Sequence, residues 1–515
     1  MILAFLIIAA IEPGLGKVHF AVSTKNAEAQ RYFDQGMAYL YGFNHEAAIK
    51  SFQEAAKRDA NLAMADWGVA LALGPNINLD VDPDREKQAY NAVQSALKKQ
   101  ASPKERDLIA VLAKRYSDDP AADLKKLAAG YSQAMGELSK KYPSDLDIAT
   151  LYAESVMDLR PWKFWSHDGK PAPQTEEIVA VLESVLKRNP SHVGANHYYI
   201  HAVEASPHPE RALESAERLN TLAPASGHLV HMPAHIYQRT GNYAGAAKAN
   251  DTAAVVDRKF MEKHGKEGIY PLMYYNHNLQ FGTASYAMEG RFADAKRLGD
   301  EFGANAAAAA KEMPMLESAA ATPILVLVRF GKWSDVVRAP VATAGPMSIT
   351  LSHFARGAAF ARLGDVPAAE REQQDFENAR ASLGDDPGVF QNSPKAIAKV
   401  AAAVLEGRIA EAKGDRARAM RAYQRAVEAE DALDYDEPAD WFYPSRETLG
   451  SALMRAGQFA EAEKVFSDDL KRNPNNPRSL FGLAEAQRKQ KKASETAAAR
   501  FKKYWRGGSL HIDDL

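Results

Sequence analysis

The stretch GMAYLYGFNHEAAIKSFQEAA, from Gly36 to Ala56, decides the fold of this chain. Small and aromatic residues recur in it at fixed intervals, namely Gly36, Tyr39, Ala48, Phe52 and Ala55. Such spacing is typical of a helix-turn-helix repeat of about 34 residues. The stretch therefore predicts a pair of helices that belongs to a longer repeat array.

The same intervals recur along the rest of the chain. The clearest copies span residues 29–62, 193–226, 227–260, 276–309, 400–433 and 443–476. This period is that of the tetratricopeptide repeat, whose helix pairs stack into a solenoid with a concave groove. We therefore expect an all-α tetratricopeptide-type solenoid, continuous from residue 26 to residue 515, whose groove is partly covered by loops.

The composition limits the classes of function. With 515 residues, 46% of them hydrophobic, the chain can bury a large core. Lys plus Arg number 64 against 66 for Asp plus Glu, so the charge balance predicts no nucleic-acid partner. Cysteine is absent, which excludes disulfides, thiolate metal ligands and a cysteine nucleophile.

The amino-terminal run from Met1 to Ile11 is apolar, too short to cross a bilayer, and suited to the core of a signal peptide, although it lacks a basic leading segment. We expect residues 1–25 to comprise a signal peptide or leader and a lead-in segment, which predicts a periplasmic or secreted protein. If residues 1–11 are an ordinary buried segment, the protein is cytoplasmic. No later stretch approaches transmembrane length.

A dense group of candidate metal ligands lies in the middle of the chain. Its members are His197, His201, Glu204, His228, His231, His235 and His277. His197, His201 and Glu204 follow one another at intervals of four and three residues, and His228, His231 and His235 at intervals of three and four. Side chains at such intervals share one face of a helix. In tetratricopeptide proteins these first-helix positions line the groove, and the resemblance implies that three successive helices aim the side chains into one space.

Pro233 complicates the second triplet, because proline inside a helix removes a backbone hydrogen bond and clashes with the preceding turn. A kink or a late helix start near Met232 is expected. In the second case His228 and His231 come from the segment before the helix, and only His235 is helical.

Imidazoles with a carboxylate suit Zn²⁺, Cu²⁺ or Fe²⁺, as one ion or two. We expect a metal-binding protein, which as an enzyme would be a hydrolase with Glu204 as catalytic base or an oxidoreductase. The alternative is a non-catalytic scaffold whose groove binds a peptide, a protein tail or a polar small molecule through hydrogen-bonding histidines. The chain has no GxSxG, Walker-type, HExxH or GxGxxG motif.

Further residues are candidates for substrate contacts or for orienting the imidazoles. They are Asn196, Asn276, Asn278, Tyr275, Asn76 and Trp162. The asparagines could equally cap helices, and the tyrosine could fill core. Two predicted loops, Gly74 to Asn78 and Lys163 to Gln174, contain the glycines and prolines that interrupt helices and could cover the groove.

Several longer motifs resemble one known family. They are Tyr41 to Ala48, Gly74 to Asn78, Asn196 to His201, His228 to Ile236, Tyr275 to Asn278 and Trp441 to Pro444. Together they resemble a family of bacterial tetratricopeptide-repeat proteins of unestablished activity that commonly carry signal peptides. The chain departs from that family at Ser23 to Lys25 and at Asn61 and Leu62, where many members have cysteine.

Overall fold

A computed structural model of the chain describes residues 11–387 and 391–515. These residues form α-helices joined by turns and loops, with a few short 3-10 and π segments and two isolated bridges. The prediction of an all-α fold is confirmed. Among the described helices, none combines the length and the apolar character needed to cross a bilayer.

The chain divides into two compact units. The first comprises the residues up to Ile236 together with Val255–Tyr270, and the second comprises Tyr237–Ala254 and Pro271–Leu515. Two of the three boundaries fall within helices, α12 (Pro233–Arg239) and α13 (Tyr243–His264), and the third lies between Tyr270 and Pro271. One continuous solenoid over residues 26–515 stays a prediction.

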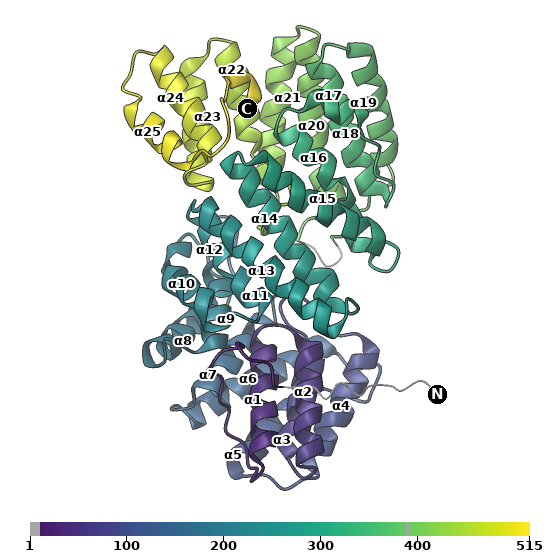
Figure 1. The fold of residues 1–515 in the computed structure, drawn as a ribbon, viewed down its shortest axis with the longest axis vertical. Coiled ribbons are helices and arrows are strands. Elements are labelled where there is room, and N and C mark those ends of the chain that lie inside the picture. Colours follow the sequence, from purple (N-terminus) through teal and green to yellow (C-terminus); the bar gives the residue numbers. More distant parts are fainter. Residues whose placement is uncertain (1–10, 388–390) are drawn as a thin grey trace. The chain divides into compact units, whose positions relative to one another are not determined.

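The helices of the first unit are coloured purple to teal in Figure 1. They are α1 (Ala27–Tyr41), α2 (His45–Arg58), α3 (Ala63–Leu73), α4 (Pro83–Leu97), α5 (Pro103–Leu112), α6 (Leu124–Lys141), α7 (Leu146–Met157), α8 (Thr175–Arg188), α9 (Val193–Val203), η1 (Pro209–Ala212), α10 (Leu213–Leu222) and α11 (Gly227–His231). Neighbours along the chain pack as pairs, and α9 also contacts α1 and α7.

The second unit continues the helical pairs in teal, green and yellow. Its elements are η2 (Pro271–Tyr275), α14 (Asn276–Glu289), α15 (Phe292–Ala309), η3 (Pro314–Ala321), α16 (Thr322–Arg329), α17 (Trp333–Arg338), α18 (Pro346–Arg362), α19 (Val366–Arg380), α20 (Pro394–Ala412), α21 (Arg416–Asp431), α22 (Ser445–Arg455), α23 (Phe459–Arg472), α24 (Pro477–Lys489), α25 (Glu495–Tyr504) and η4 (Ile512–Asp514).

Polar side chains begin many of these helices. Asn26 accepts hydrogen bonds from the backbone N–H groups of Glu28 and Ala29 at the start of α1, and Asn44 accepts one from Ala47 at the start of α2. Side-chain caps of this kind satisfy amide groups that have no partner inside the helix. The short turn between α1 and α2 is closed by the backbone N–H of Asn44, which donates to the carbonyl oxygen of Tyr39.

The glycine and aromatic positions of the repeat pack directly against one another. A Cβ atom at Gly36 would lie 2.4 Å from the ring of Phe52, and one at Gly68 would lie 2.6 Å from the same ring. The second unit repeats this arrangement, with Phe466 between Gly450 and Gly482. Each ring thus fills a space that exists only because the facing helices carry no side chain there.

The lead-in segment belongs to the first unit. Phe20 is buried, and its ring contacts those of Phe33 and Trp67 at centroid distances of 5.7 Å. The carbonyl oxygen of Gly14 accepts a hydrogen bond from the backbone N–H of Ala225 at 2.9 Å. The predicted signal peptide, Met1 to Ile11, lies outside the described residues except for Ile11.

We expect Gly36→Ala to destabilise the first unit by about 1–3 kcal/mol, because the added methyl group overlaps the buried Phe52 ring. Gly130→Ala, also inside a helix but with open space around the new methyl group, should instead stabilise by about 0.5–1 kcal/mol. Urea unfolding followed by circular dichroism measures both changes. Equal stabilities of Gly36→Ala and the unchanged protein would contradict this packing.

Candidate metal centre

Six of the predicted ligands come together in the first unit. His197 and His201 project from α9, and Glu204 is the residue that ends this helix. His228 and His231 lie in α11, and His235 lies in α12. These side chains are buried, with at most 1% of each residue exposed.

Pro233 divides the second triplet between two short helices. α11 ends at His231, Met232 has a helical backbone conformation, and α12 begins at Pro233. The proline therefore stands at the first position of a helix, where its missing N–H costs nothing. The expected break is present, and His228 and His231 nevertheless lie in a helical turn of their own.

The Glu204 carboxylate lies between two imidazoles. Its Oε1 atom is 2.7 Å from His201 Nδ1, and its Oε2 atom is 2.5 Å from His235 Nδ1. An ionised carboxylate can only accept hydrogen bonds, so both Nδ1 atoms must carry the proton. In their neutral forms, His201 and His235 therefore present a lone pair at Nε2.

His197 is oriented by the first repeat. Its Nδ1 atom lies 2.7 Å from the backbone carbonyl oxygen of Tyr41, the last residue of α1. A carbonyl oxygen is an acceptor, so Nδ1 donates, and the Nε2 atom of neutral His197 also carries a lone pair. A ligating histidine in metalloproteins commonly donates its second N–H to a carboxylate or a backbone carbonyl in this way.

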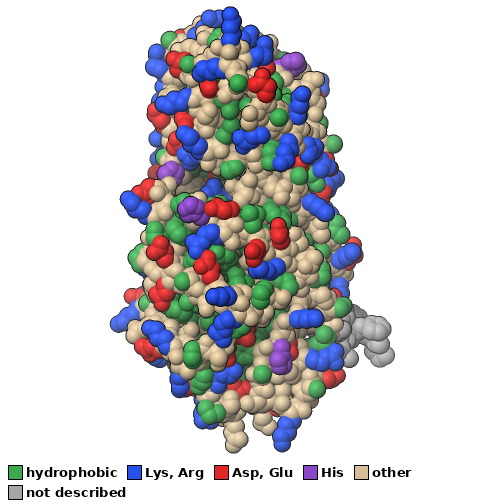
Figure 2. All heavy atoms as spheres, turned by 90° about the vertical axis from the view of Figure 1, so that its left-hand side faces the viewer, with side chains coloured by type: hydrophobic (Ala, Val, Ile, Leu, Met, Phe, Trp, Pro, Cys, Tyr) green, Lys and Arg blue, Asp and Glu red, His purple; other side chains and the backbone are tan. Residues whose placement is uncertain are grey.

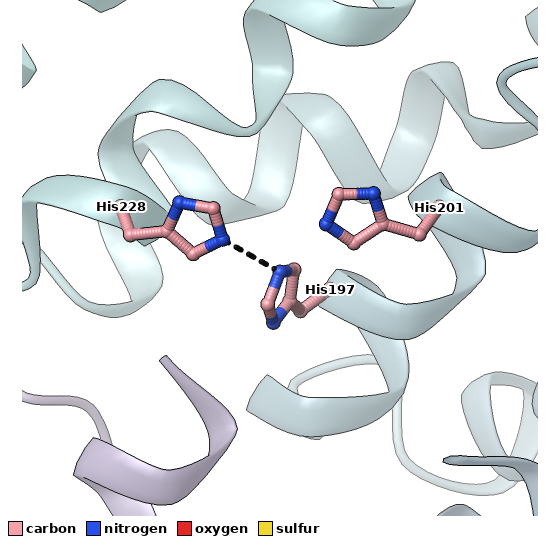
Figure 3. A group of neighbouring side chains, drawn as sticks. All are labelled: His197, His201 and His228. Carbon is pink, nitrogen blue, oxygen red and sulfur yellow. Dashed lines mark hydrogen bonds between the residues drawn. The ribbon is translucent and has the colours of Figure 1, made fainter. Parts of the chain in front are cut away.

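The imidazole rings of His197, His201 and His228 face one another (Figure 3). His197, His201 and His228 each offer one ring nitrogen within 4.8 Å of the others. The Nε2 atoms of His197 and His228 are 3.1 Å apart. His201 Nε2 is buried and has no hydrogen-bond partner among the residues that the structure describes.

Burial sets the charge of the cluster. It lowers the pKa of His197 well below 6.5, and it lowers the pKa of His201, an effect that Glu204 partly opposes. Burial alone would raise the pKa of Glu204, but His235 and His201 outweigh it and hold that pKa at about 2. At neutral pH His197 and His201 are therefore neutral, and Glu204 is a carboxylate anion.

This donor set suits a transition-metal ion. Two nitrogen ligands at 2.0–2.1 Å from a tetrahedral zinc ion stand about 3.3 Å apart, close to the 3.1 Å between the Nε2 atoms of His197 and His228. The deprotonated nitrogens that metal binding requires are already present on His197 and His201. The buried His/Glu groups could therefore hold an ion.

Two aromatic rings pack on the imidazoles. The ring of Phe43 lies 4.5 Å from that of His197 and within 6 Å of those of His201 and His228. Trp162 contacts the ring of His201 at 5.4 Å. Both residues have positive φ angles, 56° for Phe43 and 65° for Trp162, which bulky side chains rarely adopt.

Two of the other candidate residues in this unit have separate roles. Asn76 is buried, and its amide group lies 3.3 Å from His45 Nε2. The amide of Asn196 donates to the backbone carbonyl oxygens of Pro190 and His192, which ties it to the start of α9. These two hydrogen bonds of Asn196 go to the backbone at the start of α9 and not to an imidazole.

The remaining candidates belong to the second unit. They are Tyr275, Asn276, His277 and Asn278, at the start of α14. The Tyr275 hydroxyl donates to Glu301, and the Asn276 amide donates to the carbonyl oxygen of Leu272. Their assignment as ligands or supporting residues stays a prediction.

Both predicted loops are ordered. The first carries the bridge between Asn76 and Leu79. In the second, the indole N–H of Trp165 donates to the carbonyl oxygen of Ala202 at 2.8 Å. This hydrogen bond attaches the loop of residues 163–174 to α9 beside His201.

Three features of the centre are not evident from the histidine spacing. The Tyr41 carbonyl oxygen and the Phe43 ring come from the turn after α1, more than 150 residues before the cluster. His45, from the same segment, is buried, and burial lowers its pKa to about 3. Tyr41, Phe43 and His45 all belong to the Tyr41 to Ala48 motif, which is the feature of the sequence that points to them.

A different group in the second unit comprises His353, Glu372 and Asp375. Glu372 already accepts from His353 at 2.8 Å and from Arg356 at 2.7 Å, and Asp375 is exposed. An arginine beside the carboxylate opposes a cation there, so this group is a weaker candidate.

The family comparison matches the first helix pair. A model of the tetratricopeptide repeat matches residues 29–62, which include α1 and α2. The helix pair α1 and α2 thus matches one tetratricopeptide repeat in sequence. No curated protein matches its sequence.

Solved structures with low similarity include helical-repeat proteins. The anaphase-promoting complex hetero-tetramer Cut9–Hcn1 shares 12% identity over 96% of this chain and 77% of that chain, with a TM-score of 0.31. The human IFIT1 dimer with m7Gppp-AAAA shares 13% identity over 94% and 91%, with a TM-score of 0.34. The structure of Naa15/Naa10 bound to HypK-THB shares 13% identity over 93% of this chain and 83% of that chain, with a TM-score of 0.25. At these values the similarity carries no information about ligands or partners.

The charges on one face agree with the overall balance of the chain. Figure 2 shows Lys and Arg side chains interspersed with Asp and Glu side chains on that face. A face with mixed charges lacks the basic stripe that follows a nucleic-acid backbone.

We expect the metal-free protein to lose stability as the pH falls from about 7 to 5. The imidazoles of His197 and His201 stay neutral in the folded chain but take up a proton near pH 6.5 once unfolded, so acid favours the unfolded state. Each such histidine contributes a slope of at most about 1.4 kcal/mol per pH unit below its unfolded pKa, reached while it stays neutral in the folded chain. Urea unfolding in the presence of a chelator measures this slope.

The slope should be shallower in His201→Gln and unchanged in His208→Gln, because His208 is exposed. The same slope in His201→Gln as in the unchanged protein would show that His201 is not held neutral in the folded state.

Proposed function

We propose that the first unit binds a transition-metal ion through the Nε2 atoms of His197, His201 and His228. The observation that carries this proposal is the buried Nε2 atom of His201, which has no hydrogen-bond partner among the described residues. Leaving a buried acceptor without a partner costs about 1–3 kcal/mol. An ion shared with His197 and His228 removes this cost.

The hydrogen bonds around the centre support metal binding over a network of histidines alone. Such a network satisfies an imidazole best when one ring nitrogen donates and the other accepts. At His201 this rule fails, because Glu204 fixes the proton on Nδ1 while the buried Nε2 atom accepts from no described residue and so remains available as a ligand. The arrangement of acceptor, histidine and metal is the one that orients ligands in known metal sites.

The chemistry of the donors favours Zn²⁺, Cu²⁺ or Fe²⁺. The centre offers imidazole nitrogen, which suits all three ions, and the chain contains no cysteine. For an ion taken from a mixture, the order of stabilities places copper first. A bound ion would supply Lewis acidity or, for copper or iron, electron transfer.

Glu204 is proposed as a positioning residue. Both of its oxygens accept from imidazoles, so it holds His201 and His235 in their ligand tautomers. A general base needs an oxygen that can reach a water or substrate proton. Hydrolysis with Glu204 as the base is therefore less well supported than metal binding, and an oxidoreductase stays a prediction.

The scaffold alternative receives less support at this cluster. With at most 1% of each residue exposed, these imidazoles present no surface to a peptide. A small molecule or peptide elsewhere in the groove is an additional proposal that does not depend on the histidines.

Export and membership of the exported bacterial family are further proposals, supported by the apolar run from Met1 to Ile11 and by the shared motifs. Because Leu15 and Phe20 are buried in the first unit, a cleavage site would have to precede Leu15. Amino-terminal sequencing of the protein from its native cells tests this.

We expect untagged protein, purified without added metal, to contain at least one equivalent of zinc, copper or iron by elemental analysis. The double variant His197→Ala/His201→Ala should contain at least one equivalent less. His19→Ala/His208→Ala is the matched control, because both of these histidines are exposed and pair with a carboxylate.

The control should keep the full metal content, and circular dichroism should confirm that both variants are folded. Absence of metal from the unchanged protein, also after incubation with each of the three ions and desalting, would contradict the proposed function.

We expect Glu204→Gln to weaken Zn²⁺ binding about 10–100-fold. The amide can accept from only one of the two Nδ1–H groups and presents its own N–H to the other imidazole, which must then carry its proton on Nε2. Competition with a chromophoric chelator measures the affinity. Glu210→Gln changes an exposed carboxylate beside His208 and should have no effect. An unchanged affinity in Glu204→Gln would refute the positioning role.

A further inference from the structure

The imidazoles of the first unit outnumber the ligands of one ion. Five of them are buried together: His197, His201, His228, His231 and His235. Their rings are in continuous contact, with centroid distances of 4.9 Å for His197 and His228, 5.8 Å for His228 and His231, and 4.7 Å for His231 and His235. A tetrahedral site accepts four ligands. The second pair therefore calls for its own explanation.

This pair repeats the geometry of the first. The Nε2 atoms of His231 and His235 are 2.8 Å apart, and those of His197 and His228 are 3.1 Å apart. In each pair one ring has its Nδ1–H on a fixed acceptor, the Tyr41 carbonyl oxygen for His197 and the Glu204 carboxylate for His235. The lone pairs of His197 and His235 therefore point at the Nε2–H of the facing ring.

A metal ion can take the place of the proton in each pair. The ion would be bound by both Nε2 atoms. Their separation is near the distance of about 3.3 Å expected between two nitrogen ligands of one tetrahedral ion. The facing ring, His228 or His231, would keep its proton by carrying it on Nδ1 in place of Nε2. No net proton is gained or lost, and both imidazoles remain neutral.

Glu204 connects the two groups. One of its oxygens accepts from His201, which belongs to the first group, and the other accepts from His235, which belongs to the second. The rings of His201 and His235 are 5.4 Å apart. One buried anion thus lies between two sets of imidazoles, where it offsets part of the charge of two cations.

We infer that the first unit binds two divalent transition-metal ions side by side, one on His197, His201 and His228 and a second on His231 and His235, with Glu204 positioning a ligand of each. This inference rests on the proposed function and adds the second site. It makes the centre dinuclear, with imidazole ligands on both ions and a common carboxylate behind them.

The test is the number of ions bound. Untagged full-length protein is stripped with a chelator, titrated with ZnCl₂ by isothermal calorimetry, and analysed for zinc after desalting. We expect two equivalents for the unchanged protein. His231→Ala/His235→Ala should bind one, and His197→Ala/His201→Ala should also bind one. The control His19→Ala/His208→Ala should bind two.

The outcomes separate the two proposals. One equivalent in the unchanged protein, kept in His231→Ala/His235→Ala, overturns the second site and leaves the proposed function standing. Two equivalents that persist in His231→Ala/His235→Ala also overturn it, because the second ion then binds elsewhere. No bound zinc, and none of copper or iron in the same titration, overturns both.

Should the double variants fail to fold, the single variants His228→Gln and His231→Gln take their place. A paramagnetic measurement adds independent evidence. After loading with two equivalents of Cu²⁺, neighbouring ions should broaden and weaken each other's electron paramagnetic resonance signal. Two full-intensity signals of isolated Cu²⁺ would overturn the inference.

Discussion

The buried carboxylate of Glu204, which accepts hydrogen bonds from two imidazoles, is the constraint on which the proposed metal centre depends. An acceptor-only group forces the proton of each ring onto Nδ1 and so directs two lone pairs into the cluster. The Tyr41 carbonyl oxygen imposes the same tautomer on His197. Without these acceptors a neutral histidine could donate from either nitrogen, and the cluster could form an ordinary hydrogen-bonded network.

The helical repeat makes this arrangement possible. Glycines at the repeat positions let neighbouring helices approach until an aromatic ring such as Phe52 or Phe466 fills the space between them. The same stacking brings α1 against α9, so that the end of one helix supplies an acceptor to a histidine of another. The repeat is therefore both the scaffold and the source of the acceptors that orient the ligands.

The fold and the composition of the cluster follow from the sequence, because repeat intervals and the spacing of histidines along a helix are local properties. Spacing placed His197 and His201 on one face of α9, and Pro233 indicated the break before α12. The role of Glu204 could not be read in this way. Its second partner, His235, lies 31 residues away, and only the tertiary structure shows that both oxygens are occupied. The Phe43 ring and the Tyr41 carbonyl oxygen reach the centre through the same long-range packing.

A crystal structure of metal-loaded protein, with anomalous diffraction collected at the absorption edge of the metal, tests the central claim most directly. We expect anomalous density about 2.0–2.1 Å from the Nε2 atoms of His197, His201 and His228, with Glu204 still on the Nδ1 side of His201 and His235. Density outside the cluster would contradict it, and so would an ion bound by Glu204 through the Nδ1 atoms of these histidines.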